Sequence, residues 1–110
     1  MTNLEELTKE FQNLGNLFIA LGHEKRQKII LALLKDDSCE GLRVSDLLTD
    51  TNLSRPAISH HMKILKDAQI IDCKKQGTKN YYYLSHNLEK IDKLQSFISN
   101  TRLLIESKKK

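Results

Sequence analysis

The chain has little of the material that β-rich, disulfide-bonded or membrane proteins need. One of its 110 residues is proline, four are glycine, two are cysteine and none is tryptophan. So few turn-forming residues leave little material for a hairpin-rich fold, and we expect helices to dominate. Two cysteines make no disulfide framework. The longest apolar run, 29–34, is too short to cross a bilayer, and residues 1–20 lack the basic start of a signal peptide. We therefore expect a cytoplasmic protein with no membrane partner.

Size and charge narrow the function further. Hydrophobic residues make up 39% and charged residues 29% of the chain, which predicts one folded domain over 1–110. A chain of this size leaves no room for a deep substrate cavity, and no catalytic motif is visible, so we expect no enzyme. The formal charge is +4, and all of it lies in the segment 53–83. A neutral body with one basic segment is typical of a nucleic-acid binder, although solvated surface lysines give the same count.

Apolar residues recur at steps of three and four over 3–22 and again over 88–106, which predicts an amphipathic helix at each end. The first follows positions 4, 7, 11, 14, 18 and 21, a heptad seam that favours packing against another long helix. Together the two helices offer more apolar surface than a three-helix core needs. We expect the segments 1–22 and 88–106 to join two copies in a homodimer, the alternative being that they pack within one subunit.

The segment 45–67 predicts a helix-turn-helix. A short helix over 45–50, capped by Ser45, leads through a turn to a second helix, which Ser54 caps by accepting the backbone N–H of Ala57. Pro56 suits the first turn, where its missing N–H would have no helical partner. In this motif the first turns of the second helix reach base edges in the major groove. We expect double-stranded DNA to be contacted there by Ser54, Arg55, Ala57, Ser59, His60 and Lys63.

A core for this motif is expected from two helices. The first, over 24–35, turns Ile29, Ile30, Leu33 and Leu34 inward, and the second buries Ile58, Met62 and Leu65.

A basic β-hairpin is predicted over 69–84. Strand-like runs at 69–75 and 80–84 flank a tight loop at 76–79, and a hairpin after a helix-turn-helix is a wing. Lys75, Thr78 and Lys79 are expected to contact the phosphate backbone. At least one of the three tyrosines at 81–83 should pack on the core, and a stacking platform for single-stranded bases is the alternative.

At this point the chain resembles the ArsR/SmtB family of bacterial winged-helix repressors. The matching segments are 21–34, 44–48, 53–71 and 75–84, with the pattern S-x-H-[LM]-x-x-L at 59–65 and G-x-x-x-x-Y-x-L at 77–84. The resemblance implies a mainly α, winged helix-turn-helix fold with a small β-hairpin, dimerising through its N- and C-terminal helices. It also implies a repressor that binds a palindromic operator and is released by a small effector.

The metal sites of the family are incomplete here. Where some members carry a cysteine pair, the stretch 42–46 has no cysteine, and where others have D-x-H, Asp92 lacks its histidine and only Glu106 follows. Adjacent helical residues point about 100° apart, so His60 and His61 cannot easily share a metal, and His61 is interpreted as a structural imidazole. We expect no metal and no cofactor, and the effector stays unidentified.

Two further functions stay open. Cys73 adjoins Lys74, and a nearby cation lowers a thiol pKa, so Cys39 and Cys73 could report oxidants or reactive sulfur. A winged-helix module that binds a protein or RNA is the other alternative.

Overall fold

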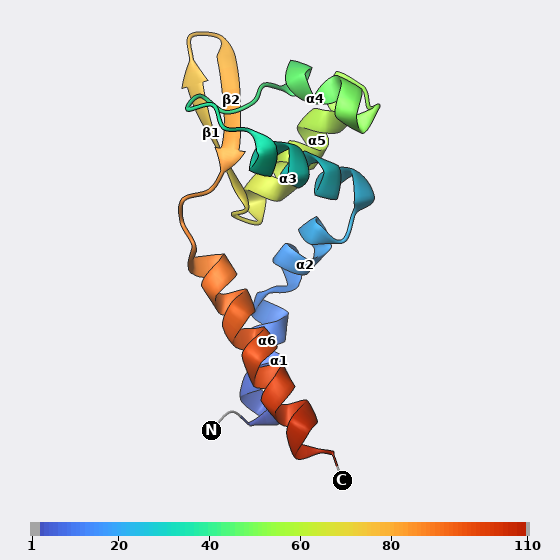
Figure 1. Cartoon of the computed structure of the whole chain (residues 1–110), viewed down its shortest axis with the longest axis vertical. Coiled ribbons are helices and arrows are strands. Elements are labelled where there is room, and N and C mark those ends of the chain that lie inside the picture. The colour runs from blue at the N-terminus through green and yellow to red at the C-terminus, as the bar shows by residue number, and fades with distance from the viewer. Residues whose placement is uncertain (1–2, 110) are drawn as a thin grey trace.

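The computed structural model describes residues 3–109. Residues 1, 2 and 110, which belong to the segments 1–22 and 1–110 named above, lie outside this range. Two parts are visible in Figure 1, an upper head and a lower arm, and together they measure 56 × 25 × 22 Å. The head contains α3 (Glu24–Lys35), α4 (Val44–Thr51), α5 (Arg55–Asp67), β1 (Ile71–Gln76) and β2 (Lys79–Leu84), and the arm contains α1 (Leu4–Asn13), α2 (Gly15–Leu21) and α6 (Glu89–Ser107).

The prediction of one helix over 3–22 is wrong. The helix breaks at Leu14, whose backbone leaves the helical region at φ −94° and ψ 5°. The Leu14 N–H is shared between the carbonyls of Glu10 and Phe11, and Gly15, a poor helix former, follows directly. The Leu14 side chain is 2% exposed, so the break turns a seam residue into the arm's own core. The heptad positions 4–21 therefore do not form one continuous stripe along a single straight helix.

The head has a core of its own, built as the sequence predicts. Ile58, Met62 and Leu65 of α5 are buried against Ile29 and Leu33 of α3. The prediction that Leu34 points inward is wrong, since its side chain is 62% exposed. The buried face of α3 is narrower than its run of consecutive apolar residues. Leu47 of α4, Ile71 of β1 and Ala20 of α2 complete the same cluster.

The predicted hairpin is confirmed, with slightly shifted bounds. β1 and β2 pair antiparallel from Ile71 opposite Leu84 to Gln76 opposite Lys79. Gly77 alone takes a positive φ, 63°, in the two-residue turn, which is the pattern of a type II′ turn. Leu42 adds an isolated bridge to Tyr82 of β2, through hydrogen bonds of 2.8 and 2.7 Å.

The arm is held together by aromatic rings and leaves much of its apolar surface open. Phe11, Phe18 and Phe97 of α1, α2 and α6 form a cluster with ring centroids 5.1 to 6.0 Å apart. None of the residues 89–107, all within the described range, is buried. Over residues 3–109, no helix combines the length and apolarity needed to cross a bilayer.

The first turn of α3 joins the arm to the head. Arg26 is 6% exposed, and its guanidinium donates to the carbonyls of Ala20 at 2.8 Å and Ile19 at 2.9 Å. The preceding Lys25 donates through Nζ to the Thr51 carbonyl at 2.8 Å. The last carbonyls of a helix lack the usual helical partners, so α3 supplies side-chain donors to the ends of both α2 and α4.

Gly41 offers a test of how the loop after α3 packs on the hairpin. Its φ is +93°, and a Cβ there would lie 2.5 Å from the Tyr82 carbonyl oxygen. We expect Gly41→Ala to lower the free energy of unfolding by about 1–3 kcal/mol, measured by urea denaturation. Gly15→Ala is the matched control, because a Cβ at Gly15 meets nothing within 4 Å and its helix favours alanine. Equal stability of the two variants would contradict this packing.

Candidate nucleic-acid interface

The second helix of the helix-turn-helix, α5, begins as the sequence predicts. The Ser54 hydroxyl accepts the Ala57 N–H at 3.3 Å, and Pro56 lies in the first turn. Opposite the buried stripe, α5 exposes polar and basic side chains. Ser54, Arg55, Ser59, His60 and Lys63 are exposed, and Ala57 is half-buried.

Two internal hydrogen bonds hold the turn between α4 and α5. The fully buried Thr51 hydroxyl donates to the Leu47 carbonyl at 2.7 Å and accepts the Leu53 N–H at 3.3 Å. Asn52 between them has φ 55° and ψ 36°, a left-handed conformation that asparagine tolerates. The orientation of α5 relative to α4 is therefore fixed locally.

Ser45 does not cap α4 as predicted. The helix begins one residue earlier, at Val44, with Arg43 at the capping position. The Arg43 N–H donates to the Asp46 carboxylate at 2.8 Å, so the cap comes from a side chain inside the first turn. An acidic side chain in that turn suits the positive end of the helix dipole.

The wing exposes the three residues predicted to meet the backbone, Lys75, Thr78 and Lys79. Lys74, also basic, is engaged internally, because its Nζ donates to the Cys39 carbonyl at 3.1 Å. Tyr82 packs against the head core, as expected of at least one tyrosine. Burial, together with the adjacent Cys73 thiol, raises the pKa of the Tyr82 hydroxyl.

A small cleft of about 170 Å³ lies where α4, α5 and the wing meet. Two of its lining residues, Arg55 and Thr78, were predicted to contact DNA. Arg43, Ser45 and Asn80 also line it, although their sequence positions did not predict contacts to DNA. Their spacing carries no motif, since they come from a loop end, a helix start and a strand that only the fold brings together.

His61 is the structural imidazole that the sequence predicts. It is 9% exposed, and its Nδ1 lies 3.1 Å from an Arg26 guanidinium nitrogen, which can only donate. His61 Nδ1 is therefore the acceptor. Burial lowers the pKa of His61, and the neighbouring His23, Arg26 and His60 lower it further.

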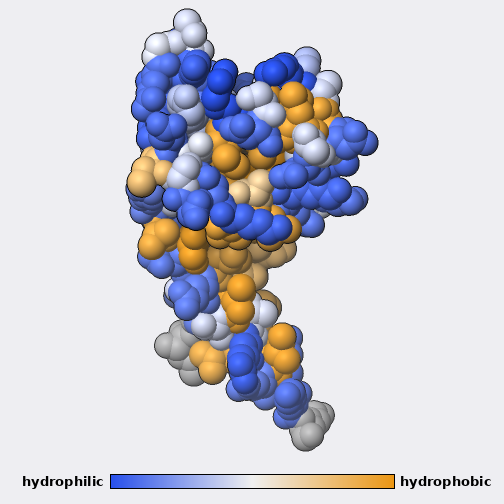
Figure 2. All heavy atoms as spheres, turned by 45° about the horizontal axis from the view of Figure 1, so that its top comes forward, coloured by the Kyte–Doolittle hydropathy of each residue, from blue (hydrophilic) through white to orange (hydrophobic). Residues whose placement is uncertain are grey.

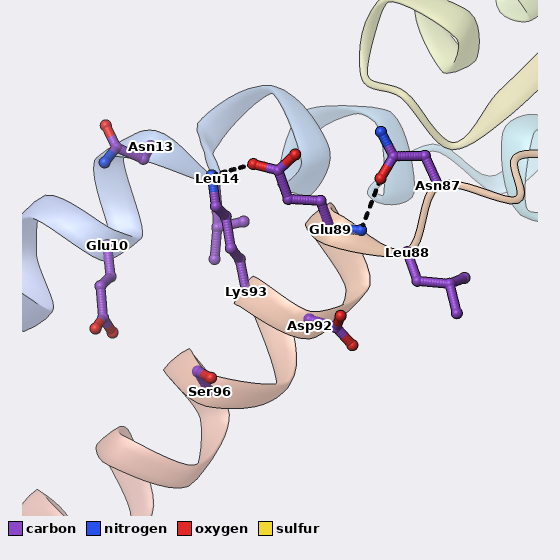
Figure 3. A pocket seen from close by; sticks show the side chains of 9 residues that line it. All are labelled: Glu10, Asn13, Leu14, Asn87, Leu88, Glu89, Asp92, Lys93 and Ser96. Carbon is purple, nitrogen blue, oxygen red and sulfur yellow. Dashed lines mark hydrogen bonds and ion pairs between the residues drawn. The ribbon is translucent and has the colours of Figure 1, made fainter.

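The arm contains a cavity of about 690 Å³ between the α1–α2 junction and the start of α6 (Figure 3). Acidic groups from both sides line it, among them Glu10, Glu89 and Asp92, and Lys93 pairs with Glu89 at 2.9 Å. The hydrogen bond and charge of Lys93 lower the pKa of Glu89. Asp92 and Glu106 are fourteen residues apart on one helix, a rise of about 21 Å, so they cannot converge within one chain. Within residues 3–109, no three His, Cys, Asp or Glu side chains gather around a possible metal position.

Neither cysteine belongs to α5. Cys39 is exposed in the loop between α3 and α4, and Cys73 is half-buried in β1 opposite Tyr82. The Cys73 thiol donates weakly to the Lys74 carbonyl at 3.9 Å.

Hydrophilic side chains cover much of the head in Figure 2, with hydrophobic patches between them, and hydrophobic residues also surface where the arm joins the head and along the arm. A helix-turn-helix with a polar, basic second helix beside a basic hairpin defines a winged-helix DNA-binding protein.

Comparison with known proteins identifies the family. Residues 23–72 match the family described as bacterial regulatory protein, arsR family. The chain is 31% identical over 94 residues to an arsenical resistance operon repressor of Staphylococcus aureus, covering 86% of this chain and 82% of that protein. It is 36% identical over 72 residues to the transcriptional repressor SdpR of Bacillus subtilis, covering 66% and 76%. The chain belongs to the ArsR family and is a DNA-binding transcriptional regulator.

Fold similarity agrees with this assignment. The solved structure of an ArsR family transcriptional regulator matches with a TM-score of 0.73, over 99% of this chain and 100% of that one. At 21% sequence identity, this likeness concerns the fold. The resemblance found in the sequence and the winged-helix fold class are confirmed, and the individual DNA-contacting residues stay predictions.

The buried His61 predicts how stability depends on pH. The pKa of His61 in the folded chain lies below the ordinary value of 6.5. Below pH 6.5, His61 therefore binds a proton more readily in the unfolded chain than in the folded one. We expect the free energy of unfolding to fall as the pH drops through about 6.5 toward the lower folded pKa, by at most about 1.4 kcal/mol per pH unit from this residue. His61→Asn, which keeps an acceptor near the Nδ1 position, should flatten the slope. His86→Asn, at an exposed imidazole, is the control, and equal slopes in all three proteins would refute the assignment.

Proposed function

We propose that the chain is a homodimeric repressor that binds a palindromic double-stranded operator and blocks transcription there. The observation that carries the proposal is the exposed polar and basic face of α5, placed beside a basic wing. The repressors among its relatives support the direction of control. A regulator of this kind acts in the cytoplasm, where bacterial DNA lies, and it acts by occupying DNA rather than by catalysis.

The arm supports the proposed dimer. Its surface carries large apolar side chains that a lone subunit leaves in water, and contiguous exposed apolar surface marks an interaction site. Those more than half exposed are Leu4, Phe11, Ile19, Leu88, Ile91, Ile98, Leu103 and Ile105. A two-fold axis through α1 and α6 would cover most of them and would set the two α5 helices to face successive major grooves, about 34–36 Å apart.

The predicted DNA contacts fall into two groups, one on α5 and one on the wing. Ser54, Arg55, Ala57, Ser59, His60 and Lys63 read or position the major groove from α5. Lys75, Thr78 and Lys79 hold the adjacent backbone from the wing. Arg43 and Asn80 line the cleft beside Arg55, and we add them as phosphate contacts, because their cationic and amide N–H groups suit phosphate oxygens. The small effector that would release the operator stays unidentified.

A charge in the arm should separate the subunits. Ile98 is 58% exposed, so Ile98→Glu should leave the subunit folded but place an unpaired carboxylate in the dimer interface. We expect the dimer dissociation constant to rise by about 100-fold or more in analytical ultracentrifugation, with a matching loss of DNA affinity. Leu31→Glu, at a 53% exposed leucine of α3, is the matched control. A wild-type chain that stays monomeric at micromolar concentration would refute the proposal.

The wing can be tested through its salt dependence. Lys79→Ala should weaken binding to all duplex sequences alike and reduce the slope of log K against log salt by about 0.9, since one phosphate is no longer neutralised. Anisotropy titrations of a labelled genomic fragment, selected with the purified protein, would measure both quantities. Lys108→Ala removes the same charge just after α6, at the far end of the arm, and should change neither. If Lys79→Ala behaves like Lys108→Ala, the wing assignment fails.

A further inference from the structure

Arg26 of α3 links the arm to the recognition helix, because its side chain bonds both to α2 of the arm and to His61 of α5. Among the described residues 3–109, Arg26 is the one residue whose side chain hydrogen-bonds both to the arm and to another helix of the head. Two of its nitrogens donate to the last turn of α2, at 2.8 and 2.9 Å, and a third lies 3.1 Å from His61 on α5. Apart from this contact, α5 packs mainly against α3, α4 and β1, all of which belong to the head.

The geometry of this contact is rigid. A guanidinium is planar and presents its donors in a fixed fork, so three bonds to two helices fix their relative orientation. The His61 ring is also held from its other neighbours, with the His23 ring centroid at 4.6 Å and that of His60 at 5.9 Å. Buried as they are, Arg26 and His61 have little room to change rotamer.

A contribution to folding stability alone does not explain why a charged guanidinium, that of Arg26, is buried at this position. Burying a guanidinium loses its hydration, and well-packed apolar residues usually stabilise a core as well or better. Directional hydrogen bonds differ from apolar packing because they specify one arrangement. The recognition helices of a dimer need such a specified arrangement, since an error of one base-pair rise, about 3.4 Å, puts one helix out of register with its half-site.

We propose that the hydrogen bond from Arg26 to His61 is a positioning contact that sets the angle between arm and recognition helix. It thereby sets the separation of the two α5 helices in the dimer. The proposal rests on the proposed homodimer. Arg26 and His61 touch no DNA in it and act through the placement of α5.

The test measures the separation of the α5 helices without DNA. Lys66, exposed near the end of α5, is replaced by cysteine in a Cys39→Ser/Cys73→Ser background and labelled with a nitroxide, so that dipolar spectroscopy reports the label-to-label distance. His61→Leu removes the acceptor but leaves the bonds of Arg26 to α2 in place. We expect its distance distribution to broaden and its maximum to move by a few ångströms. His61→Asn should restore the narrow wild-type distribution.

Two controls separate positioning from stability. All distances are measured well below the unfolding midpoint of each variant, where a merely stabilising contact would leave the distribution unchanged. His86→Leu removes an exposed imidazole and should keep the wild-type distance. A dimeric His61→Leu protein with the wild-type distribution overturns this inference alone. A labelled wild-type chain with no dipolar signal overturns the proposed dimer, and the inference with it.

Discussion

The buried guanidinium of Arg26 is the hydrogen-bonding group that joins the arm to the recognition helix, alongside the packing of Ala20 in the head core. It closes the open end of α2 with two hydrogen bonds and reaches α5 with a third. A neighbouring residue, Lys25, closes the end of α4 in the same way. Because unsatisfied helix ends are costly to bury, one turn of α3 decides where three other helices lie. The helix-turn-helix is thus oriented by polar contacts at helix ends as well as by its apolar core.

The head and the arm differ in how much of their apolar surface is buried within one subunit. The head buries an apolar core within one subunit, with Ile29, Leu47, Ile58 and Leu65 fully buried. Its large exposed apolar side chains are confined to Leu31 and Leu34 of α3 within the described residues. The arm buries Leu7, Leu14 and Leu17 but leaves the whole of α6 partly in water. A second copy that covers the arm would add stability by mass action. In this account the association of subunits and the presentation of two recognition helices are one structural event.

Local chemistry made much of the fold predictable. The Ser54 cap, the buried stripe of α5 and the glycine turn of the wing follow from capping, periodicity and backbone rules that act over a few residues. The break at Leu14 beside Gly15 and the start of α4 at Val44, capped by Asp46, also have local causes, but the apolar periodicity alone does not include them. The outward turn of Leu34 depends on tertiary neighbours. Arg26 precedes Ile29, Ile30 and Leu33 by three, four and seven positions, so the sequence already places this charged residue on an apolar stripe. The exposed residues of α5 and the wing were selected from the same local rules, whereas the cleft that adds Arg43 and Asn80 exists only once three elements meet.

In the proposed complex, two copies of this chain present two recognition helices to one face of duplex DNA. Hydroxyl-radical and methylation footprinting on a genomic fragment selected by the purified protein measures this most directly. We expect two symmetric protected major-groove patches, with centres about 10–10.5 base pairs or a multiple of that apart, flanked by backbone protection from the wings. A single asymmetric patch, or protection confined to the minor groove, would contradict it.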